Sequence, residues 1–178
     1  VSGVLLTDVT VDTSTASTGG AFSVVGATLE CTRCVITGST ATTTLPEYAG
    51  AGFKVGNTAI VKLVDPNVTQ TTGPLMGGVF GQTSGEITAT GCRFESATAD
   101  MAGDLIGSTG TGKFNLDKCH VLNMGVAGWS MGVIMLVDGA SVTIKDSIFD
   151  QFTQALMYVA KSTAVVTGST FTNMNGPD

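Results

Sequence analysis

Arg93, His120 and Asp117 are the residues of this sequence that come nearest to a catalytic set. Arg93 and His120 stand at the same position of two consecutive sequence repeats, so we expect them to be neighbours on one surface, with Asp117 a strand away. A guanidinium, an imidazole and a carboxylate are groups that take part in acid–base catalysis. Polar side chains on a solvated face more often have no such role, so catalysis by this trio is the weaker interpretation.

The cysteines give a second set of candidates. Cys31 and Cys34 have the spacing of redox and metal-binding motifs, but no second pair of this kind follows and the chain has a single histidine. The sequence therefore predicts no metal site and no cofactor. Cys92 and Cys119 stand at equivalent positions of adjacent repeats, so we expect them to stack in the core as reduced side chains, although distance alone would also allow a disulfide.

Binding residues are expected where the sequence is least repetitive, because loops on a rigid scaffold usually carry contacts. Glu47 and Tyr48 lie in one such segment and Trp129 lies in another. Asn67 begins Asn-Val-Thr, an acceptor sequence for N-glycosylation, and its position in the repeat places it outward. We therefore predict binding through Glu47, Tyr48 and Trp129, and a glycan at Asn67.

The composition argues against several classes of protein. The net charge is -6 and the eight Lys and Arg residues are spread thinly, so no basic patch is available for a nucleic-acid partner. No apolar run approaches the roughly 18 residues that cross a bilayer, so no transmembrane segment is expected. Hydrophobic residues at 43% and charged residues at 12%, with abundant Gly, Thr and Ser, favour many short strands joined by tight turns.

An internal repeat organises the whole chain. Its unit is apolar-x-apolar-x-x-small-x-apolar, and consecutive copies begin 25, 32, 26, 27, 28 and 22 residues apart. The first two apolar residues alternate as in a strand, and one extra residue before the small position reverses the alternation, which predicts a bend. The seven copies are Val4/Leu6/Val9/Val11, Leu29/Cys31/Cys34/Ile36, Val61/Leu63/Pro66/Val68, Ile87/Ala89/Cys92/Phe94, Phe114/Leu116/Cys119/Val121, Val142/Ile144/Ser147/Phe149 and Ala164/Val166/Ser169/Phe171.

A third apolar pair precedes each following copy, which gives three short strands per coil. The distance from this pair to the next copy is nearly constant, at 7, 8, 7, 9, 7 and 7 residues, whereas the distance from each copy to the pair varies between 8 and 17 residues. Insertions are therefore expected at one corner of each coil, where they leave a stacked core undisturbed. The pairs are Phe22/Val24, Phe53/Val55, Phe80/Gln82, Leu105/Gly107, Met135/Val137 and Met157/Val159.

The repeat predicts an all-β fold: a right-handed parallel β-helix, or β-solenoid, of about seven coils with three short strands per coil. One coil cannot bury its inward residues, and stacking at the strand spacing of about 4.8 Å creates one continuous core. Residues 1–178 are expected to form a single domain. Because the chain opens at Val1 without a Met or a signal peptide, we expect it to be a segment of a longer protein.

Several short motifs resemble those of known β-helices. Gly19-Gly-Ala-Phe22 resembles the Gly-Gly-Ala-Ile element of the repeats in polymorphic outer-membrane proteins and adhesins. The coils as a whole are similar to the pectin-lyase-like class of right-handed β-helices, and the resemblance covers essentially the whole chain. The segments that resemble the phenylalanine-bearing strand of the adhesin repeat are Cys92-Arg-Phe94, Ser147-Ile-Phe149 and Ser169-Thr-Phe171-Thr-Asn173.

The resemblance also frames the choice of function. Hydrolases of the β-helix class carry Asn-Thr-Asp, Asp-Asp, Gly-His-Gly and Arg-Ile-Lys signatures, none of which occurs in this sequence, and its lyases use an acidic calcium cluster, whereas acidic residues are scattered here. We therefore expect a structural or adhesive module, secreted or on a cell surface. Its variable corner would contact other protein subunits, copies of itself or glycans, or assemble filaments. The alternative is a carbohydrate-active enzyme of lyase or hydrolase type that uses Arg93, His120 and Asp117.

Overall fold

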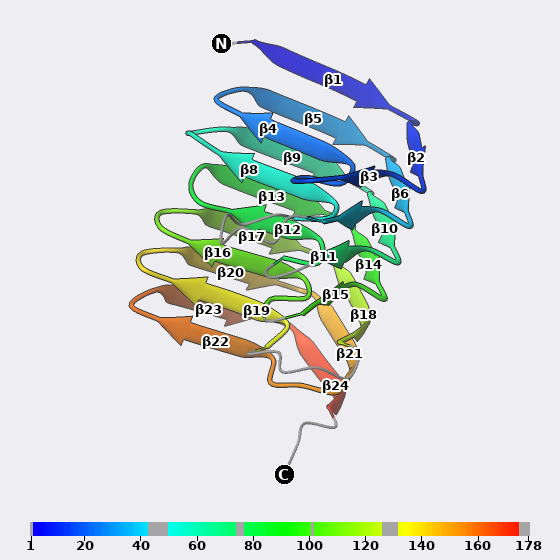
Figure 1. The fold of residues 1–178 in the computed structure, drawn as a ribbon. Helices are drawn as coiled ribbons and strands as arrows, with labels where there is room; N and C mark the ends of the chain where they lie inside the picture. Colours follow the sequence, from blue (N-terminus) through cyan, green and yellow to red (C-terminus); the bar gives the residue numbers. More distant parts are fainter. Residues whose placement is uncertain (1, 43–49, 74–76, 101, 126–131, 175–178) are drawn as a thin grey trace.

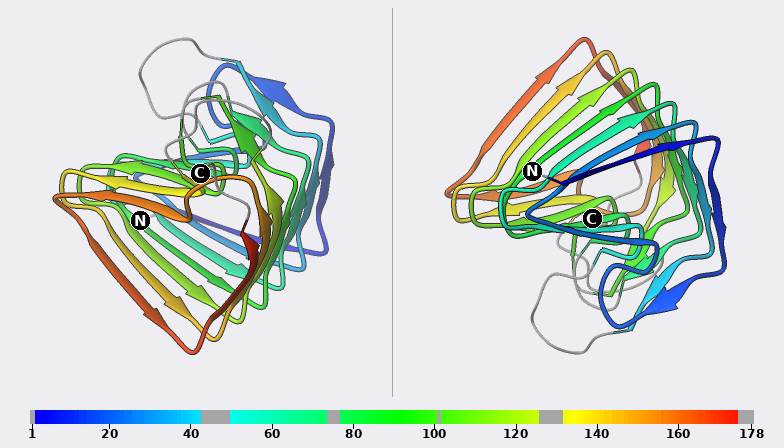
Figure 2. Two further views of the ribbon diagram at one scale, coloured as in Figure 1. Left: turned by 90° about the horizontal axis from the view of Figure 1, so that it is seen from below. Right: turned by 90° about the horizontal axis from the view of Figure 1, so that it is seen from above.

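The chain winds into a right-handed parallel β-solenoid, as predicted (Figure 1). The computed structural model describes residues 2–42, 50–73, 77–100, 102–125 and 132–174. Every regular element among these residues is a β-strand, and paired strands run parallel. Viewed from the N-terminal end, the coils turn clockwise as they recede, which is the hand that parallel crossovers adopt in nearly all proteins (Figure 2).

Two seven-stranded sheets are built from the two halves of the repeat unit. Sheet A holds the first apolar pair of every copy, and sheet B holds the residues after the bend. The strands of sheet A are β1 (Gly3–Thr7), β5 (Thr28–Thr32), β9 (Ile60–Val64), β13 (Glu86–Thr90), β17 (Lys113–Asp117), β20 (Ser141–Lys145) and β23 (Thr163–Thr167). The strands of sheet B are β2 (Thr10–Asp12), β6 (Val35–Thr37), β10 (Asn67–Thr69), β14 (Arg93–Glu95), β18 (His120–Met124), β21 (Ile148–Phe152) and β24 (Thr170–Met174).

Two further sheets complete the coils. The strands of sheet D, which holds the third apolar pair, are β4 (Phe22–Val25), β8 (Phe53–Gly56), β12 (Phe80–Gln82), β16 (Ile106–Thr109), β19 (Ile134–Val137) and β22 (Met157–Ala160). Sheet C lies between sheets B and D along the chain and has the two-residue strands β3 (Thr15–Ala16), β7 (Thr40–Ala41), β11 (Thr72–Gly73) and β15 (Thr98–Ala99). Three strands per coil is therefore wrong for the first four coils, which have four.

The number of complete turns is smaller than the seven predicted. The last copy of the repeat contributes β23 and β24, but it adds no strand to sheet D within the described residues. Sheet D accordingly has six strands, whereas sheets A and B have seven. All seven repeat copies are nevertheless present as strands of sheets A and B.

The predicted bend within the repeat is confirmed. The residue between sheets A and B has a φ between 48° and 66° in all seven coils, and this left-handed residue reverses the alternation of the side chains. A second left-handed column lies at the end of sheet B, directly after the strand in the first four coils and at its penultimate residue in the last three. The residues of the first column are Asp8, Arg33, Asp65, Gly91, Lys118, Asp146 and Gly168, and those of the second are Thr13, Gly38, Gln70, Ser96, Asn123, Gln151 and Asn173.

The register of sheets A and B follows the predicted columns. Leu116 pairs with Ala89 on one side and Ile144 on the other, and all three are buried. Alignment of the repeat copies also predicts the outward columns, and the strand pairing confirms them. They are Thr7, Thr32, Val64, Thr90, Asp117, Lys145 and Thr167 in sheet A, and Thr10, Val35, Asn67, Arg93, His120, Ile148 and Thr170 in sheet B.

In sheet D the predicted register is wrong by one residue in two coils. Phe80 pairs with Ile106, and Ile106 pairs with Ile134. The inward pairs are therefore Ile106/Ser108 and Ile134/Leu136, in place of Leu105/Gly107 and Met135/Val137. Residues 133–137 are apolar at every position, so alternation alone cannot decide which of them face inward.

Variation in coil length is confined to the connection from sheet B to sheet D, which we call the B–D corner (residues 13–21, 38–52, 70–79, 96–105, 125–133 and 153–156). With the observed register, the opposite D–A corner spans 7 or 8 residues between leading inward residues in every coil. Viewed along the axis, sheets A, B and D form three sides of the coils (Figure 2). Coils of different length therefore share one core.

Side chains from the three main sheets fill the interior as continuous columns. Phe22, Phe53 and Phe80 stack in successive strands of sheet D, with ring centroids 5.3 Å apart at each step. Phe94 from sheet B meets Phe80 edge-on at 5.4 Å. Such aromatic pairs each contribute about 0.5 to 1.5 kcal/mol beyond the area they bury, so each coil depends on its neighbours.

All four cysteines form disulfides, which corrects the expectation of reduced packing. Cys92 pairs with Cys119 in the adjacent coil, and Cys31 pairs with Cys34 across the bend of one coil. The column continues with serines, since Cys119 N–H donates to Ser147 Oγ at 3.0 Å and Ser147 N–H donates to Ser169 Oγ at 3.1 Å. Covalent and hydrogen-bonded links thus tie the fourth to seventh coils together along the bend between sheets A and B.

Candidate functional site

Arg93 and His120 lie side by side on the outer face of sheet B, where they are partners in β14 and β18. The guanidinium of Arg93 is bound to Glu95 on its own strand, with Nη2 2.7 Å and Nε 3.2 Å from Oε2. The Arg93 and Glu95 side chains are 47% and 35% exposed, so the interaction is a surface ion pair in high dielectric. Glu95 was missed in the sequence, although strand alternation puts it on the same face as Arg93.

Asp117, the third member of the predicted trio, belongs to sheet A and lies around the bend from His120. It pairs with Thr90 and Lys145 in its own sheet. Its Oδ1 is buried and makes no hydrogen bond. The trio therefore spans two sheets, and a catalytic role for it stays a prediction.

His120 also lies near Asp150 in the next strand of sheet B. Asp150 Oδ1 accepts hydrogen bonds from Thr172 Oγ1 and Asn173 Nδ2, each at 2.7 Å. These two bonds, with a smaller contribution from the charge of His120, hold the pKa of Asp150 below its ordinary value. Asp150 is therefore ionised at neutral pH and unsuited to donate a proton as a general acid.

The cysteines have no free thiol to offer a redox partner or a metal. All four are in disulfides, and their side chains are no more than 2% exposed. Within the described ranges, no three His, Cys, Asp or Glu side chains gather closely enough to hold a metal ion. The Cys31 and Cys34 spacing thus serves a covalent link across a bend.

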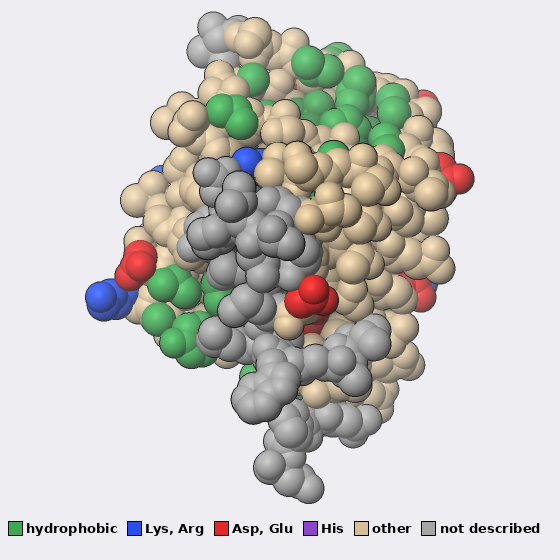
Figure 3. All heavy atoms as spheres, viewed as in Figure 1, with side chains coloured by type: hydrophobic (Ala, Val, Ile, Leu, Met, Phe, Trp, Pro, Cys, Tyr) green, Lys and Arg blue, Asp and Glu red, His purple; other side chains and the backbone are tan. Residues whose placement is uncertain are grey.

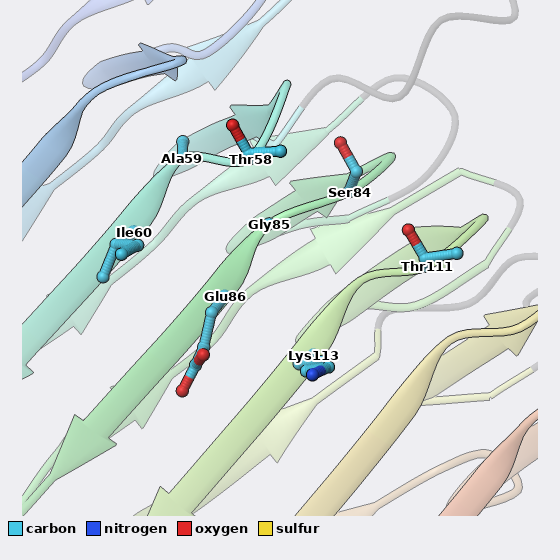
Figure 4. A pocket seen from close by; sticks show the side chains of 8 residues that line it. All are labelled: Thr58, Ala59, Ile60, Ser84, Gly85, Glu86, Thr111 and Lys113. Carbon is cyan, nitrogen blue, oxygen red and sulfur yellow. The ribbon is translucent and has the colours of Figure 1, made fainter. Parts of the chain in front are cut away.

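A shallow groove crosses three successive D–A corners, those that lead into the third, fourth and fifth coils (Figure 4). Its volume is about 290 Å³, at the lower limit of ligand pockets. Thr58, Ser84 and Thr111 contribute one hydroxyl from each coil, and Glu86 and Lys113 are partners in adjacent strands of sheet A. Such a surface can hydrogen-bond to a polar ligand, but it does not enclose one.

Asn67, the predicted glycosylation site, lies on the outer face of sheet B in β10, between Val35 and Arg93. Its side chain is half-buried, and its Oδ1 is buried without a hydrogen-bond partner. A glycan on this residue would project from the middle strands of the sheet. Modification of Asn67 stays a prediction.

The predicted binding residues Glu47, Tyr48 and Trp129 lie outside the described residues. The described residues around Trp129 place both ends of its segment. Gly125 N–H donates to Ala97 O at 3.3 Å, and Gly132 O accepts from Gly103 N–H at 2.8 Å. The segment that contains Trp129 is therefore attached at both ends to the fourth coil.

Asp104 is a buried acidic residue that the repeat pattern did not single out. It is 1% exposed and stands two residues before sheet D, where the preceding coils have Gly20, Ala51 and Gly78. Its Oδ1 accepts a hydrogen bond from Ala99 N–H at 2.7 Å, and its Oδ2 accepts none. Burial raises the pKa of Asp104 to about 7, against the opposing effect of the Ala99 bond. An acidic residue in a column of small residues is the signal that could have found it.

Comparisons with known proteins find no relative for this chain: no family model matches it, and neither a curated protein nor a solved structure is significantly similar. The part of the chain that the structure describes contains no helix long and apolar enough to span a membrane. On the face shown in Figure 3, charged side chains are few and scattered. Function is therefore inferred from the fold and the surface alone.

Proposed function

We propose that the chain is a structural or adhesive β-solenoid module of a secreted or cell-surface protein. The B–D corner is the part that contacts partners, which are other protein subunits, further copies of the chain or glycans. Kinship with adhesin repeats or with pectin-lyase-like β-helices belongs to the same proposal, and it rests on the sequence motifs that resemble theirs.

The observation that carries this proposal is the confinement of length variation to one corner of a regular frame. The D–A corner has nearly the same length in every coil, whereas the B–D connection differs from coil to coil. Loops of differing length on a rigid scaffold are where binding residues are usually found. Tyr48 and Trp129 belong to these connections, and large aromatic side chains dominate many contact sites.

The two disulfides support a location in an oxidising compartment. Structural disulfides persist in secreted and surface proteins and are rare in the cytosol. Cys92 and Cys119 are 27 residues apart in the sequence and join adjacent coils, so their bond reinforces the stack itself. A covalently reinforced rod suits a module that must hold its shape outside a cell.

Binding to a panel of immobilised glycans and uronic-acid polymers tests this function. We expect Trp129→Ala and Tyr48→Ala to weaken binding at least about tenfold at an unchanged melting temperature, because truncation of a central aromatic contact costs about 2 kcal/mol or more. Thr143→Ala, on the outer face of sheet A, is the matched control and should bind as the wild type does.

Two results would count against the proposal. Loss of binding in Thr143→Ala with none in the corner variants would move the contact to sheet A. Turnover of polygalacturonate that Arg93→Ala abolishes would instead support the carbohydrate-active alternative, since Arg93 and His120 lie side by side on an exposed sheet.

A further inference from the structure

Within the described residues, β15 in the fourth coil is the last strand of sheet C, and Asp104 lies beside it. The paired neighbour of β15 among these residues is β11. The N–H of Ala99 in β15 donates to Asp104 Oδ1 at 2.7 Å, where a further strand would have supplied a backbone carbonyl. The carboxyl group therefore takes up a backbone N–H of β15 that no strand of the described residues pairs with.

The second oxygen of this carboxyl lies beside the same glycine as the side-chain amide of Gln154. Asp104 Oδ2 and Gln154 Oε1 are both buried, and neither makes a hydrogen bond. Both side chains converge on Gly125, because a Cβ built there would lie 3.2 Å from Asp104 Oδ2 and 2.7 Å from Gln154 Nε2. Residues of the fourth, fifth and sixth coils thus meet beside a glycine that leaves them room.

An ionised carboxylate at this position lacks the partners that would stabilise its charge. Its one hydrogen bond among the described residues comes from a neutral backbone N–H, and burial without an opposing charge favours the protonated form. Asp100 after β15 and Asp150 in β21 are the charged residues nearest in sequence on the packed elements, and neither contributes to the raised pKa of Asp104. Burial raises the pKa of Asp104 to about 7, in agreement with this geometry.

We propose that Asp104 and Gln154 form a proton-dependent latch that holds the B–D corner of the fourth, fifth and sixth coils together. When Asp104 is protonated, its Oδ1 keeps the Ala99 N–H, and its hydroxyl donates beside Gly125 to the Gln154 amide, which turns its oxygen toward Asp104. When the proton leaves to solvent, a buried negative charge remains with only neutral donors beside it, the Ala99 N–H and the Gln154 amide. The corner then opens far enough for water to reach the carboxylate.

The direction of the pH dependence follows from linkage. The closed corner binds the Asp104 proton more tightly than the open corner does, so closure is favoured at low pH and is lost as the pH rises from the ordinary value of 3.8 toward about 7. Gly125 and Gly132, which flank the segment of Trp129, are both attached to the coil that carries Asp104. Opening of the Asp104 site would therefore also affect the attachment of Gly125 and Gly132 in the proposed binding corner. The latch itself does not depend on the proposed binding function.

Hydrogen exchange of the Ala99 amide, followed by NMR between about pH 5 and pH 8 and corrected for the intrinsic rate, tests the latch. We expect its protection factor to fall by up to about tenfold per pH unit and to level off near pH 7. Asp104→Asn keeps the shape of the side chain and should make the protection independent of pH. Asp100→Asn, which changes an exposed neighbour, is the matched control and should keep the slope.

A direct titration of the wild-type protein keeps the test independent of how the variants fold. The carboxyl 13C resonance of Asp104 should titrate close to neutral pH. Titration near the ordinary aspartate value, or the same slope in Asp104→Asn as in the wild type, would overturn the latch. Calcium chloride that removes the slope from the wild type would overturn it as well, because the paired oxygens would then bind a cation.

Discussion

At the scale of single residues, stability depends on whether a side chain faces the stacked core. Leu116 in β17 is 1% exposed, whereas Thr143 in the neighbouring strand β20 points outward and is exposed. We expect Leu116→Ala to lower the free energy of unfolding by roughly 2 to 5 kcal/mol, because it leaves a cavity between coils, and Thr143→Ala to lower it by less than about 0.5 kcal/mol. Denaturant unfolding measures both, and equal losses would contradict the register.

Gly78 tests a close approach of two backbones inside the B–D corner. A Cβ on Gly78 would overlap Asp104 O and would lie 2.8 Å from Thr98 O, and neither backbone atom can move alone. Gly78→Ala should therefore cost about 1 to 3 kcal/mol in thermal or denaturant unfolding. Gly3→Ala is the control, since the nearest atom to its Cβ would be 3.7 Å away. Equal stability of the two variants would mean that the corner yields easily.

At the scale of strands and bends, the two disulfides differ in the length of chain they close. Cys92 and Cys119 are 27 residues apart, and Cys31 and Cys34 are 3 apart. Loss of chain entropy in the unfolded state then gives about 3.5 kcal/mol for the first bond and about 2 kcal/mol for the second. Replacing Cys92 and Cys119 together by Ala should therefore lower the free energy of unfolding more than replacing Cys31 and Cys34. The reverse order would show that strain, not loop length, decides.

The strands differ in how far the sequence could predict them. Sheets A and B were predictable because an inward pair, a bend residue and a second inward pair recur at fixed spacing in all seven copies. The inward residues of sheet D were predictable only where polar residues interrupt the apolar run. Around Leu105 and Met135 the apolar residues are consecutive, so the predicted register was wrong there. Two-residue strands such as Thr15–Ala16 are too short to show alternation, so sheet C was missed.

The residues of the candidate site also differ in how far the sequence could predict their positions. The adjacency of Arg93 and His120 follows from the columns, and so was predictable. The stacking of Cys92 on Cys119 was predictable too, but stacking alone does not decide between two thiols and a disulfide. Asp104 could have been noticed as an acidic residue in a column of small residues, but its burial depends on the path of the B–D corner, which the repeat does not specify.

At the scale of the whole molecule, the first and last coils have unpaired edges. Among the described residues, β1 pairs only with β5, and β23 pairs only with β20. Inward residues that are buried in the middle coils are open at the ends, with Val4 55% and Val166 38% exposed, and hydrophobic side chains gather at the N-terminal end (Figure 3). β1 and β23 are each five residues long, so the last coil of one copy can continue into the first coil of another.

We therefore expect the recombinant chain of 178 residues to associate end to end, because an unpaired strand is a template for strand addition. Sedimentation velocity over a range of concentrations measures this association. The sedimentation coefficient should increase with concentration. A single monomeric species at the highest concentration would show that the ends do not pair with each other.

The central claim is that each coil has a fixed path except at the B–D corner, and one pair of insertions tests it most directly. A flexible Gly/Ser segment of about ten residues is placed after Thr42, in the B–D corner of the second coil, or after Asn57, in the D–A corner of the same coil. The D–A corner is closed by hydrogen bonds from Ala59 N–H to Gly56 O at 3.2 Å and from Ile60 N–H to Ala27 O at 2.9 Å.

We predict that the insertion after Thr42 leaves the melting temperature within a few degrees of the wild type, since lengthening a loop that is already long costs only about 0.6 kcal/mol per doubling. The insertion after Asn57 should lower the melting temperature by about 10 °C or more, because it separates strands that the stack holds in register. Equal tolerance of both insertions, or greater tolerance at Asn57, would contradict the claim that only the B–D corner can vary.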